Sequence, residues 1–230
     1  CDITMTDLIN DPSILNKNLN GIAFVGGFSY SDVFGAGVGW ASRIKNNMEL
    51  KENMDRFFND PKKFSLGICN GCQLMSLLGI LPNIRLVEND SKRFESRYVS
   101  IKILESNCIF TRDMENTTFG MWSAHGEGKF VLNHELDENE ELSPLRYVDD
   151  DGNITETYPF NPNGSPNGVA SICSRNGRHL AMMPHPERCF KDWQCPYIEP
   201  EIEKNLGEFS PWFGLFKNAH KFCENNIDVL

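Results

Sequence analysis

Residues 64–78 of this 230-residue chain, FSLGICNGCQLMSLL, restrict the possible folds more than any other segment. The segment opens with an apolar run over residues 64–68, which predicts a buried strand. A turn with two glycines follows, and residues 72–78 then show the pattern of an amphipathic helix. A strand, a sharp turn and a helix in this order form a nucleophile elbow. The sequence therefore predicts an α/β fold that presents Cys69 at the top of its sheet.

Cys69 stands at the nucleophile position of this elbow. The turn strains the backbone there, and glycines on either side avoid collisions with the neighbouring strand and helix. Unpaired N–H groups and the helix dipole at the helix N-terminus favour the thiolate over the thiol. We therefore predict that Cys69 is a nucleophile. The alternative, from residue type alone, is a buried core cysteine.

Cys69 and Cys72 also form a C-x-x-C pair, which has two other interpretations. A redox dithiol normally opens the helix of a thioredoxin-like βαβ unit, and no such pattern surrounds this pair. A zinc site needs a second pair of ligands, and Cys189 and Cys195 are available for it. We predict no metal in this chain, because better partners for Cys69 occur elsewhere, but the mixed zinc site stays open as an alternative.

Those better partners lie in HLAMMPHPER, residues 179–188, which begins with an apolar stretch typical of a strand. Two prolines flank His185 and exclude helix, so we expect His185 and Glu187 to be extended with their side chains on one side. Glu187 would then accept a hydrogen bond from one imidazole nitrogen while the other nitrogen faces a nucleophile. Thiol, base and carboxylate together predict a catalytic triad. The simpler alternative is a loop histidine beside a solvated glutamate.

The composition excludes several classes of function. A hydrophobic fraction of 40% and a charged fraction of 23% describe an ordinary globular domain, and the length predicts one domain. A net charge of −10 argues against nucleic acid as the main partner. The sequence contains no apolar run of membrane-spanning length and no signal peptide. We therefore expect the eight cysteines to be reduced thiols of a cytoplasmic protein with no membrane partner.

Hydrophobic periodicity and turn residues predict the other elements. Residues 137–141, DENEE, predict an acidic solvated loop to which we assign no function. Residues 161–168, NPNGSPNG, predict a long structured loop, either a linker or a functional surface. The expected elements are a short strand at 1–5, a buried strand at 21–27, one helix over 40–58, an antiparallel or mixed middle with strands at 98–104, 118–123, 129–132, 145–148 and 154–158, a hairpin of 169–173 and 180–183, and a final helix over 211–225.

Several motifs together resemble one known family, the class I (triad) glutamine amidotransferases. The triad motifs are GGF, GICNGCQ and PHPE, and the resemblance covers nearly the whole chain. It implies a three-layer, flavodoxin-like α/β fold with a central mixed, mostly parallel sheet flanked by helices. More narrowly, the chain is similar to the glutaminase domain of members that act on formylglycinamide ribonucleotide in purine biosynthesis. That narrower similarity is carried by GGFSYSDVFGAG, GICNGCQLM, NDSKRFESR, SAHGEG, NPNGSPNG and MMPHPER.

The resemblance assigns a role to each matching residue. Cys69 would attack the side-chain carboxamide of L-glutamine, His185 would activate the thiol and protonate the leaving ammonia, and Glu187 would orient His185. The backbone N–H groups of Gly27 and Asn70 would hold the oxyanion, as the elbow geometry also suggests. The substrate pocket would include Gln73, one helical turn beyond Cys69, together with Phe94 and Glu95, and with His125 as a weaker candidate.

The resemblance also implies a partner, because the ammonia must be used. No Walker motif and no clustered acidic metal site occurs in the sequence. An ATP- and Mg²⁺-dependent synthetase is therefore implied on the same or a partner chain, with residues 161–168 as a candidate docking loop and no cofactor in this domain. The alternatives are a different Cys-His α/β hydrolase and a noncatalytic binding module that keeps the elbow. A binding module would be expected to lose His185 or Glu187, and both are present.

The beginning of the sequence departs from the family pattern. The opening strand and first helix of the family are missing here. We therefore expect residues 1–230 to be a single glutaminase domain, cut from the C-terminal part of a longer chain.

Overall fold

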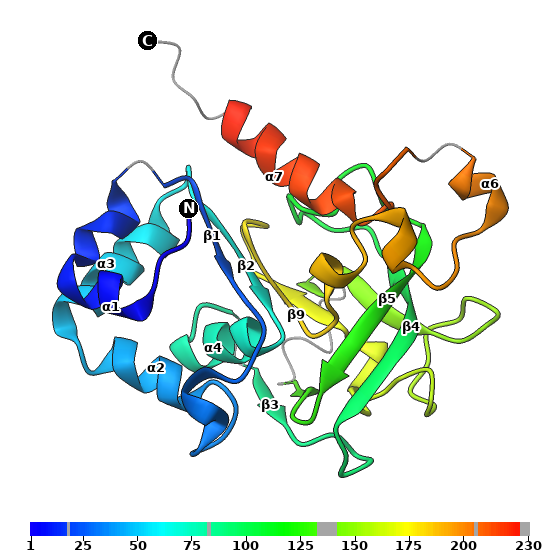
Figure 1. Ribbon diagram of the computed structural model, residues 1–230, viewed down its shortest axis with the longest axis horizontal. Helices are drawn as coiled ribbons and strands as arrows, with labels where there is room; N and C mark the ends of the chain where they lie inside the picture. Colours follow the sequence, from blue (N-terminus) through cyan, green and yellow to red (C-terminus); the bar gives the residue numbers. More distant parts are fainter. Residues whose placement is uncertain (18, 82–83, 133–141, 205–206, 226–230) are drawn as a thin grey trace.

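A four-stranded sheet in the order β1-β2-β9-β8 lies in the middle of the computed structural model (Figure 1). β1 (Gly21–Phe24), β2 (Phe64–Ile68) and β9 (His179–Met182) run parallel, and β8 (Ser171–Cys173) pairs antiparallel with β9. Apart from the edge strands, these are short apolar runs, as expected of strands covered on both faces. The predicted mixed, mostly parallel sheet and its C-terminal hairpin are confirmed.

The structure describes every residue except 18, 82–83, 133–141, 205–206 and 226–230. The acidic loop predicted at residues 137–141 thus lies outside the described residues. Within the described part of the chain, no helix is both long and apolar enough to cross a membrane. The other elements are α1 (Met5–Asn10), α2 (Val38–Lys45), α3 (Met48–Asn59), α4 (Asn70–Leu78), α6 (Pro200–Glu203), α7 (Phe213–Asn225), β3 (Arg85–Val87), β4 (Glu95–Ile103), β5 (Thr118–His125), β6 (Lys129–Val131) and β7 (Leu145–Val148).

Different layers cover the two faces of the central sheet. Gly67 of β2 faces α4, because a Cβ at this position would lie 2.5 Å from the sulfur of Met75. Phe64 of the same strand faces the other way and makes ring contacts with Phe110 and with Phe222 of α7. Helices α2, α3 and α4 therefore lie on one side of the sheet, and α7 and the antiparallel strands lie on the other (Figure 1). This arrangement confirms the predicted three-layer α/β fold.

A second sheet, in the order β5-β4-β7, is antiparallel throughout and confirms the antiparallel pattern predicted for the middle of the chain. It meets the central sheet at two bridges. One joins Arg146 of β7 to Val169, just before β8. At the other, the N–H of His185 donates to the carbonyl of Trp122 in β5 at 2.7 Å. His185 follows β9 closely, so the chain that leaves the central sheet is fixed directly to the second sheet.

Two of the elements predicted near the N-terminus are wrong. The predicted strand at residues 1–5 is instead the approach to α1, capped by Thr4. The Thr4 hydroxyl accepts from the N–H of Asp7 at 3.2 Å, and the Asp7 carboxylate accepts from the N–H of Thr4 at 2.8 Å. This reciprocal cap stabilises a helix start in spite of the β-branched residues before it. The single helix predicted over residues 40–58 is two helices, because the Asn47 side chain caps a new start by accepting from the N–H of Leu50.

The hairpin predicted after β7 forms only in part. The Asp149 carboxylate accepts from the N–H groups of Asp151 and Asn153, so the turn itself is present. The strand predicted at residues 154–158 is reduced to one bridge between Val148 and Ile154. Beyond that point the chain contacts the loop at residues 161–168 instead of a partner strand: the Asn161 amide donates to the carbonyl of Thr155, and the N–H of Asn167 donates to the Glu156 carboxylate. This loop is therefore part of the packed structure and not a free linker.

Candidate active site

The predicted elbow is present, with Cys69 between β2 and α4. Its φ of 50° and ψ of −102° lie outside the regions that non-glycine residues ordinarily adopt. Such a conformation costs about 1–3 kcal/mol and persists where the surroundings fix it. Here the N–H of Cys69 donates to the carbonyl of Met182 in β9 at 2.8 Å. The elbow is thereby tied to the neighbouring strand, which ends just before His185.

The state of the Cys69 thiol differs from the sequence prediction. Burial raises the pKa of Cys69 to about 11, and this effect exceeds the lowering by the backbone N–H of Asn70 and by the charge of Arg188. The thiol donates weakly to the carbonyl of Ala124, with 3.6 Å between sulfur and oxygen. The N–H of Asn70 at the helix N-terminus favours the thiolate, as predicted, but burial outweighs this effect and the thiol is the favoured form. A base must remove the proton when the thiol reacts.

His185 carries the features of such a base. Its Nδ1 lies 2.5 Å from Oε1 of Glu187, which fixes the imidazole. Its Nε2 is buried and has no hydrogen-bond partner among the described residues. A Cβ added at Gly26 would lie 2.9 Å from Cε1 of His185 and 3.3 Å from Cβ of Cys69, so both side chains meet over this glycine. The structure thus brings Cys69, His185 and Glu187 together.

The backbone that positions Glu187 is not the one predicted. Residues Pro186–Arg188 form a single 3₁₀ turn, and His185 alone is extended, with φ of −111° and ψ of 92°. Proline is compatible with the first position of a helical turn, because its φ suits the turn and its missing N–H would have no partner there. The turn, and not alternation along an extended segment, carries the carboxylate to Nδ1 of His185.

A cavity of about 300 Å³ opens beside Cys69 and His185, at the small end of the range for ligand pockets. Gly27, Gln73 and Phe94 line it as predicted. Asn70 is the first residue of α4, where its backbone N–H has no partner within the helix. The remaining lining residues are Phe28, Asp32, Ala36, Ser96, Ala124, His125, Gly126, Glu127 and Arg188.

Gln73 is held by the protein at both ends of its amide. Its Nε2 donates to the carbonyl of Glu127 at 2.7 Å, and its Oε1 accepts from Nδ2 of Asn70 at 3.0 Å. A side-chain amide has two donors and two acceptor positions, so one of each is left for a ligand. Gln73 therefore both lines the cavity and connects α4 to the opposite wall.

Glu95 does not line the cavity, unlike its neighbours Phe94 and Ser96. It is buried and accepts two hydrogen bonds from Arg97. Burial acts to raise the pKa of Glu95, but hydrogen bonds from Ser91 and Arg97 outweigh it and the pKa is lowered. The carboxylate predicted for the glutamine pocket is instead an ion-pair partner behind its wall. Strand alternation explains this, since consecutive residues of β4 face opposite sides.

The chain matches the CobB/CobQ-like glutamine amidotransferase domain over residues 1–223. It belongs to this family. Phosphoribosylformylglycinamidine synthase of Dictyostelium discoideum is 47% identical to it over 239 residues, which cover 97% of this chain and 18% of the relative. The human protein of that name is 43% identical, covering 96% of this chain and 18% of the relative.

The solved structures include one with the same fold. A structure described as PurLQS from Thermotoga maritima matches with a TM-score of 0.64 and 24% identity, covering 92% of this chain and 82% of that one. Together with the family match, it supports the flavodoxin-like class I amidotransferase architecture. This amidotransferase domain spans less than a fifth of the length of the curated relatives it matches.

Sequence reasoning did not select several residues that line the cavity of this amidotransferase domain. Arg188 directly follows Glu187 and adds a positive charge, and Asp32 and Glu127 add negative ones. Ala124 contributes only its backbone carbonyl, which no sequence pattern identifies. Glu127 lies within the SAHGEG motif that carried the narrower resemblance, so the motif was a usable signal for this wall.

The two cysteine alternatives find little support in the amidotransferase domain. Cys72 is fully buried in the core, and burial raises its pKa well above the usual range, which makes it unsuited to thiol exchange. The thiols of Cys189 and Cys195 donate to backbone carbonyls. Over the described residues, no group of three or more His, Cys, Asp or Glu side chains is placed to hold a metal ion.

Substitution of His185 by Ala is expected to lower glutamine hydrolysis by about 10²–10⁴-fold, because it removes the group that transfers the proton. Glu187→Gln is expected to lower it less, since the imidazole remains and the Glu187 side chain is 42% exposed. The measurement is kcat for glutamate release, with circular dichroism to show that both variants are folded. A larger loss for Glu187→Gln would mean that the two roles are assigned wrongly.

Proposed function

We propose that this domain hydrolyses the side-chain amide of L-glutamine through a thioester on Cys69 and supplies the ammonia to an ATP-dependent synthetase. The synthetase would convert formylglycinamide ribonucleotide to formylglycinamidine ribonucleotide in purine biosynthesis. One observation supports the proposal: the Cys69 thiol lies beside the same cavity as Nε2 of His185, which has no hydrogen-bond partner among the described residues. The chain that carries these two groups belongs to the glutamine amidotransferase family.

The chemistry follows from the groups beside the cavity. Nε2 of His185 takes the thiol proton as the sulfur attacks the carboxamide carbon of glutamine, forming a C–S bond and a tetrahedral oxyanion. The imidazolium then gives this proton to the departing nitrogen, the C–N bond breaks, and ammonia and a thioester result. Nε2 next removes a proton from water, whose oxygen attacks the thioester. The C–S bond breaks, the thiol regains its proton and glutamate leaves.

Electrostatic stabilisation of the oxyanion is assigned to the backbone. The N–H of Asn70 at the start of α4 and the N–H of Gly27 in the cavity wall are the proposed donors. The raised pKa of the Cys69 thiol suits this scheme. A neutral thiol needs no counter-charge at rest, and charge develops only when His185 and the oxyanion donors are in place.

A docking partner for this domain is supported by its surface and by the length of its relatives. Phe28 and Phe94 at the cavity are exposed, and so are the nearby Val25, Val33 and Phe34. Exposed apolar residues gathered at one place are typical of an interaction surface. We assign this surface to the synthetase, on the same or a partner chain, and ATP and Mg²⁺ to that synthetase. The loop at 161–168 is a weaker docking candidate, because Asn161, Asn163 and Ser165 are buried.

The cellular location and the absence of nucleic-acid and membrane partners are part of the same proposal. A purine-biosynthetic amidotransferase with a net charge of −10 is expected to work in the cytoplasm, without nucleic acid or membrane as a partner.

Labelling with a glutamine-like diazoketone tests the proposal. The reagent should alkylate Cys69 and no other cysteine, and excess glutamine should slow the labelling, as measured by mass spectrometry of peptides. Cys69→Ala should abolish the label. Labelling spread over several cysteines at rates that glutamine does not change would contradict the proposal, because a specific pocket around Cys69 would then be absent.

A further inference from the structure

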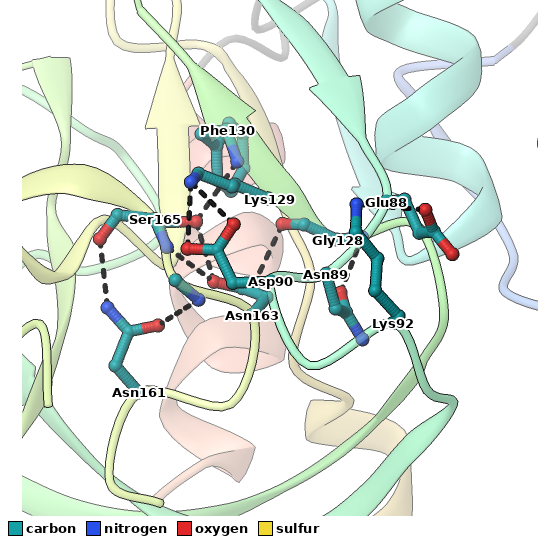
Figure 2. Close-up of polar contacts among 11 residues, drawn as sticks. Glu88, Asn89, Asp90, Lys92, Gly128, Lys129, Phe130, Asn161, Asn163 and Ser165 are labelled. Atoms are coloured by element: carbon teal, nitrogen blue, oxygen red, sulfur yellow. Dashed lines mark hydrogen bonds and ion pairs between the residues drawn. The ribbon is translucent and has the colours of Figure 1, made fainter. Parts of the chain in front are cut away.

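One buried side chain, that of Asn89, holds two separate segments of the cavity wall. Asn89 lies just after β3 and opens the NDSKRFESR motif. It is fully buried, so its amide is satisfied by protein groups. Figure 2 shows Asn89 beside Gly128 and Lys92, to which it is hydrogen-bonded. The other atoms that it binds show which parts of the cavity depend on it.

The first segment is the bend at residues 126–128, which joins β5 to β6. Nδ2 of Asn89 donates to the carbonyl of His125 at 2.8 Å, and Oδ1 accepts from the N–H of Gly128 at 3.0 Å. The backbone N–H of Asn89 donates to the carbonyl of Gly126 at 2.9 Å. Because a bend has no ladder of backbone hydrogen bonds, its peptide groups need other partners. Asn89 supplies three of these partners and so fixes the peptide planes of the bend.

The same bend carries the attachment point of Gln73. Between the two glycines of the bend, the carbonyl of Glu127 accepts from Nε2 of Gln73 at 2.7 Å. Nδ2 of Asn163 donates to the next carbonyl, that of Gly128, at 2.8 Å. Gln73, Gly126 and Glu127 all line the cavity. A shift of the bend would therefore move this wall and the amide of Gln73 together.

The second segment leads to Phe94. Nδ2 of Asn89 also donates to the carbonyl of Arg93 at 2.9 Å, and the carbonyl of Asn89 accepts from the N–H of Lys92 at 2.9 Å. These two bonds close the turn at residues 89–93. Phe94 comes next, lines the cavity, and has its ring beside that of Phe28. The position of Phe94 therefore depends on the same amide as the bend does.

The turn is anchored on its outer side by the loop at residues 161–168. Asp90 binds Nζ of Lys129 through both carboxylate oxygens, at 2.7 and 2.8 Å (Figure 2). The N–H of Asp90 donates to the carbonyl of Asn163 at 3.2 Å. A Cβ on Gly164 would lie 2.1 Å from the Asp90 carboxylate, so the loop and the turn are in direct contact. The loop thus helps to keep Asn89 in its buried position.

The orientation of the Asn89 amide is fixed by its partners. The carbonyls of Arg93 and His125 need a donor, and the N–H of Gly128 needs an acceptor, so Nδ2 and Oδ1 cannot be exchanged. A carboxylate of the same shape would place an oxygen opposite two carbonyl oxygens. An apolar side chain would leave all three groups without their partner, which is unfavourable for buried polar groups.

We propose that Asn89 is a positioning residue of the cavity, whose amide fixes the bend at 126–128 and Phe94 relative to each other and so sets where Gln73 and Phe94 meet the bound glutamine. The inference rests on the proposed glutaminase function and extends it. The hydrogen bonds of Asn89 go to residues 92–93 and 125–128 and not to the thiol or the base. Its effect should therefore fall on the binding of glutamine and not on the chemical step.

Asn89→Ala is expected to raise KM for glutamine by about tenfold or more and to leave kcat within about threefold of the wild type. Lost binding that is equal in the ground state and the transition state raises KM alone, and one hydrogen bond commonly changes an equilibrium by up to about tenfold. Asn89→Asp keeps the shape and the acceptor for Gly128 but loses the donor. It should raise KM at least as much as Asn89→Ala does.

Asn218→Ala is the matched control. Asn218 is also buried, and its Nδ2 also donates to two backbone carbonyls, those of Phe110 and Arg112, at 2.9 and 2.6 Å. It belongs to α7 and does not line the cavity. Its replacement should lower the thermal unfolding temperature, as that of Asn89 does, and leave KM unchanged.

The measurement is steady-state glutamate release with the synthetase part present, and thermal unfolding shows that each variant is folded. An unchanged KM in Asn89→Ala, or an equal rise in Asn218→Ala, would overturn the inference. A wild-type KM in Asn89→Asp would also overturn it, since the shape of the side chain would then be sufficient. A fall in kcat without a rise in KM would do the same, because the chemical step would then depend on Asn89.

Hydrogen exchange of the wild-type protein tests the inference independently of how well the variants fold. Cys69 is labelled with the glutamine-like diazoketone, and exchange is compared with that of the unlabelled protein by mass spectrometry. Peptides that cover residues 89–94 and 125–128 should both exchange more slowly after labelling, because one side chain joins them. Slower exchange in one segment only, or in neither, would overturn the inference. A wild-type protein that neither hydrolysed glutamine nor reacted with the diazoketone would instead refute the proposed function, which is a separate result.

Discussion

Cys69→Ala is expected to lower glutamine-dependent synthesis by about 10⁴-fold or more, while synthesis from ammonium salts continues at the wild-type rate. The reason is the proposed separation of glutamine hydrolysis, in this domain, from the use of ammonia, in the synthetase. Removing the nucleophile leaves no route to the thioester, so no ammonia is released from glutamine. Ammonium supplied in solution bypasses this step, and Cys69 takes no part in the synthetase reaction. The change removes one buried sulfur at the elbow and leaves the exposed apolar surface intact.

The measurement is product formed from glutamine or from ammonium chloride, for each variant with the synthetase part present. Cys72→Ala is the matched control, because it removes the same atom three residues away, where the side chain is fully buried in the core. It should keep most of both activities. Loss of the ammonium-dependent activity in a folded Cys69→Ala protein would contradict the proposed separation. An equal loss of glutamine-dependent activity in both variants would favour a site that uses the two thiols together.

Gly71→Ala is expected to destabilise the domain by about 3 kcal/mol and to abolish glutamine hydrolysis in any protein that still folds. A Cβ at this position would lie 2.0 Å from the carbonyl oxygen and 2.6 Å from the carbonyl carbon of Phe24. Both atoms belong to the backbone of β1, so no side-chain rotation relieves the contact. Either α4 or β1 must shift, and α4 begins directly after Cys69. The same movement would displace the nucleophile.

The free energy of unfolding in urea, measured by tryptophan fluorescence, checks this prediction. Gly79→Ala is the control at the other end of α4, where φ is +74° and a Cβ would meet no atom within 4 Å. It adds backbone strain without a collision and should cost about 1 kcal/mol, with hydrolysis retained. A stability for Gly71→Ala equal to that of Gly79→Ala would show that close approach to β1 is unimportant at the elbow.

The parts of the site that lie close together in sequence could be predicted from the sequence. The elbow around Cys69 is a local strand, turn and helix, so its backbone geometry depends on residues within a few positions. The His185–Glu187 pair is equally local, and the predicted contact is present although a 3₁₀ turn forms it. At the N-terminus, the capping box of Thr4 and Asp7 was also local, but the prediction of a strand at residues 1–5 did not take it into account.

The opposite wall of the cavity could not be predicted in this way. Ala124 and His125 reach the site only because β5 is joined to the segment after β9, a pairing between distant parts of the chain. The placement of Glu95 behind the wall depends on the same sheet. The raised pKa of Cys69 follows from burial by these distant elements. A sequence shows the helix terminus that favours a thiolate. It does not show the distant residues that bury the sulfur and so favour the thiol.

The bridge between His185 and Trp122 has a consequence for how the domain opens. Proteins unfold locally in cooperative units that often coincide with such sheets. The nucleophile is attached to one sheet, through the bond from Cys69 to Met182, and the base is held by the other. Any partial opening that separates the two sheets therefore breaks the bond that positions the base, before either sheet unfolds. Partly unfolded molecules of this kind would be inactive. Ammonia would be released only by domains in which the two sheets are in contact.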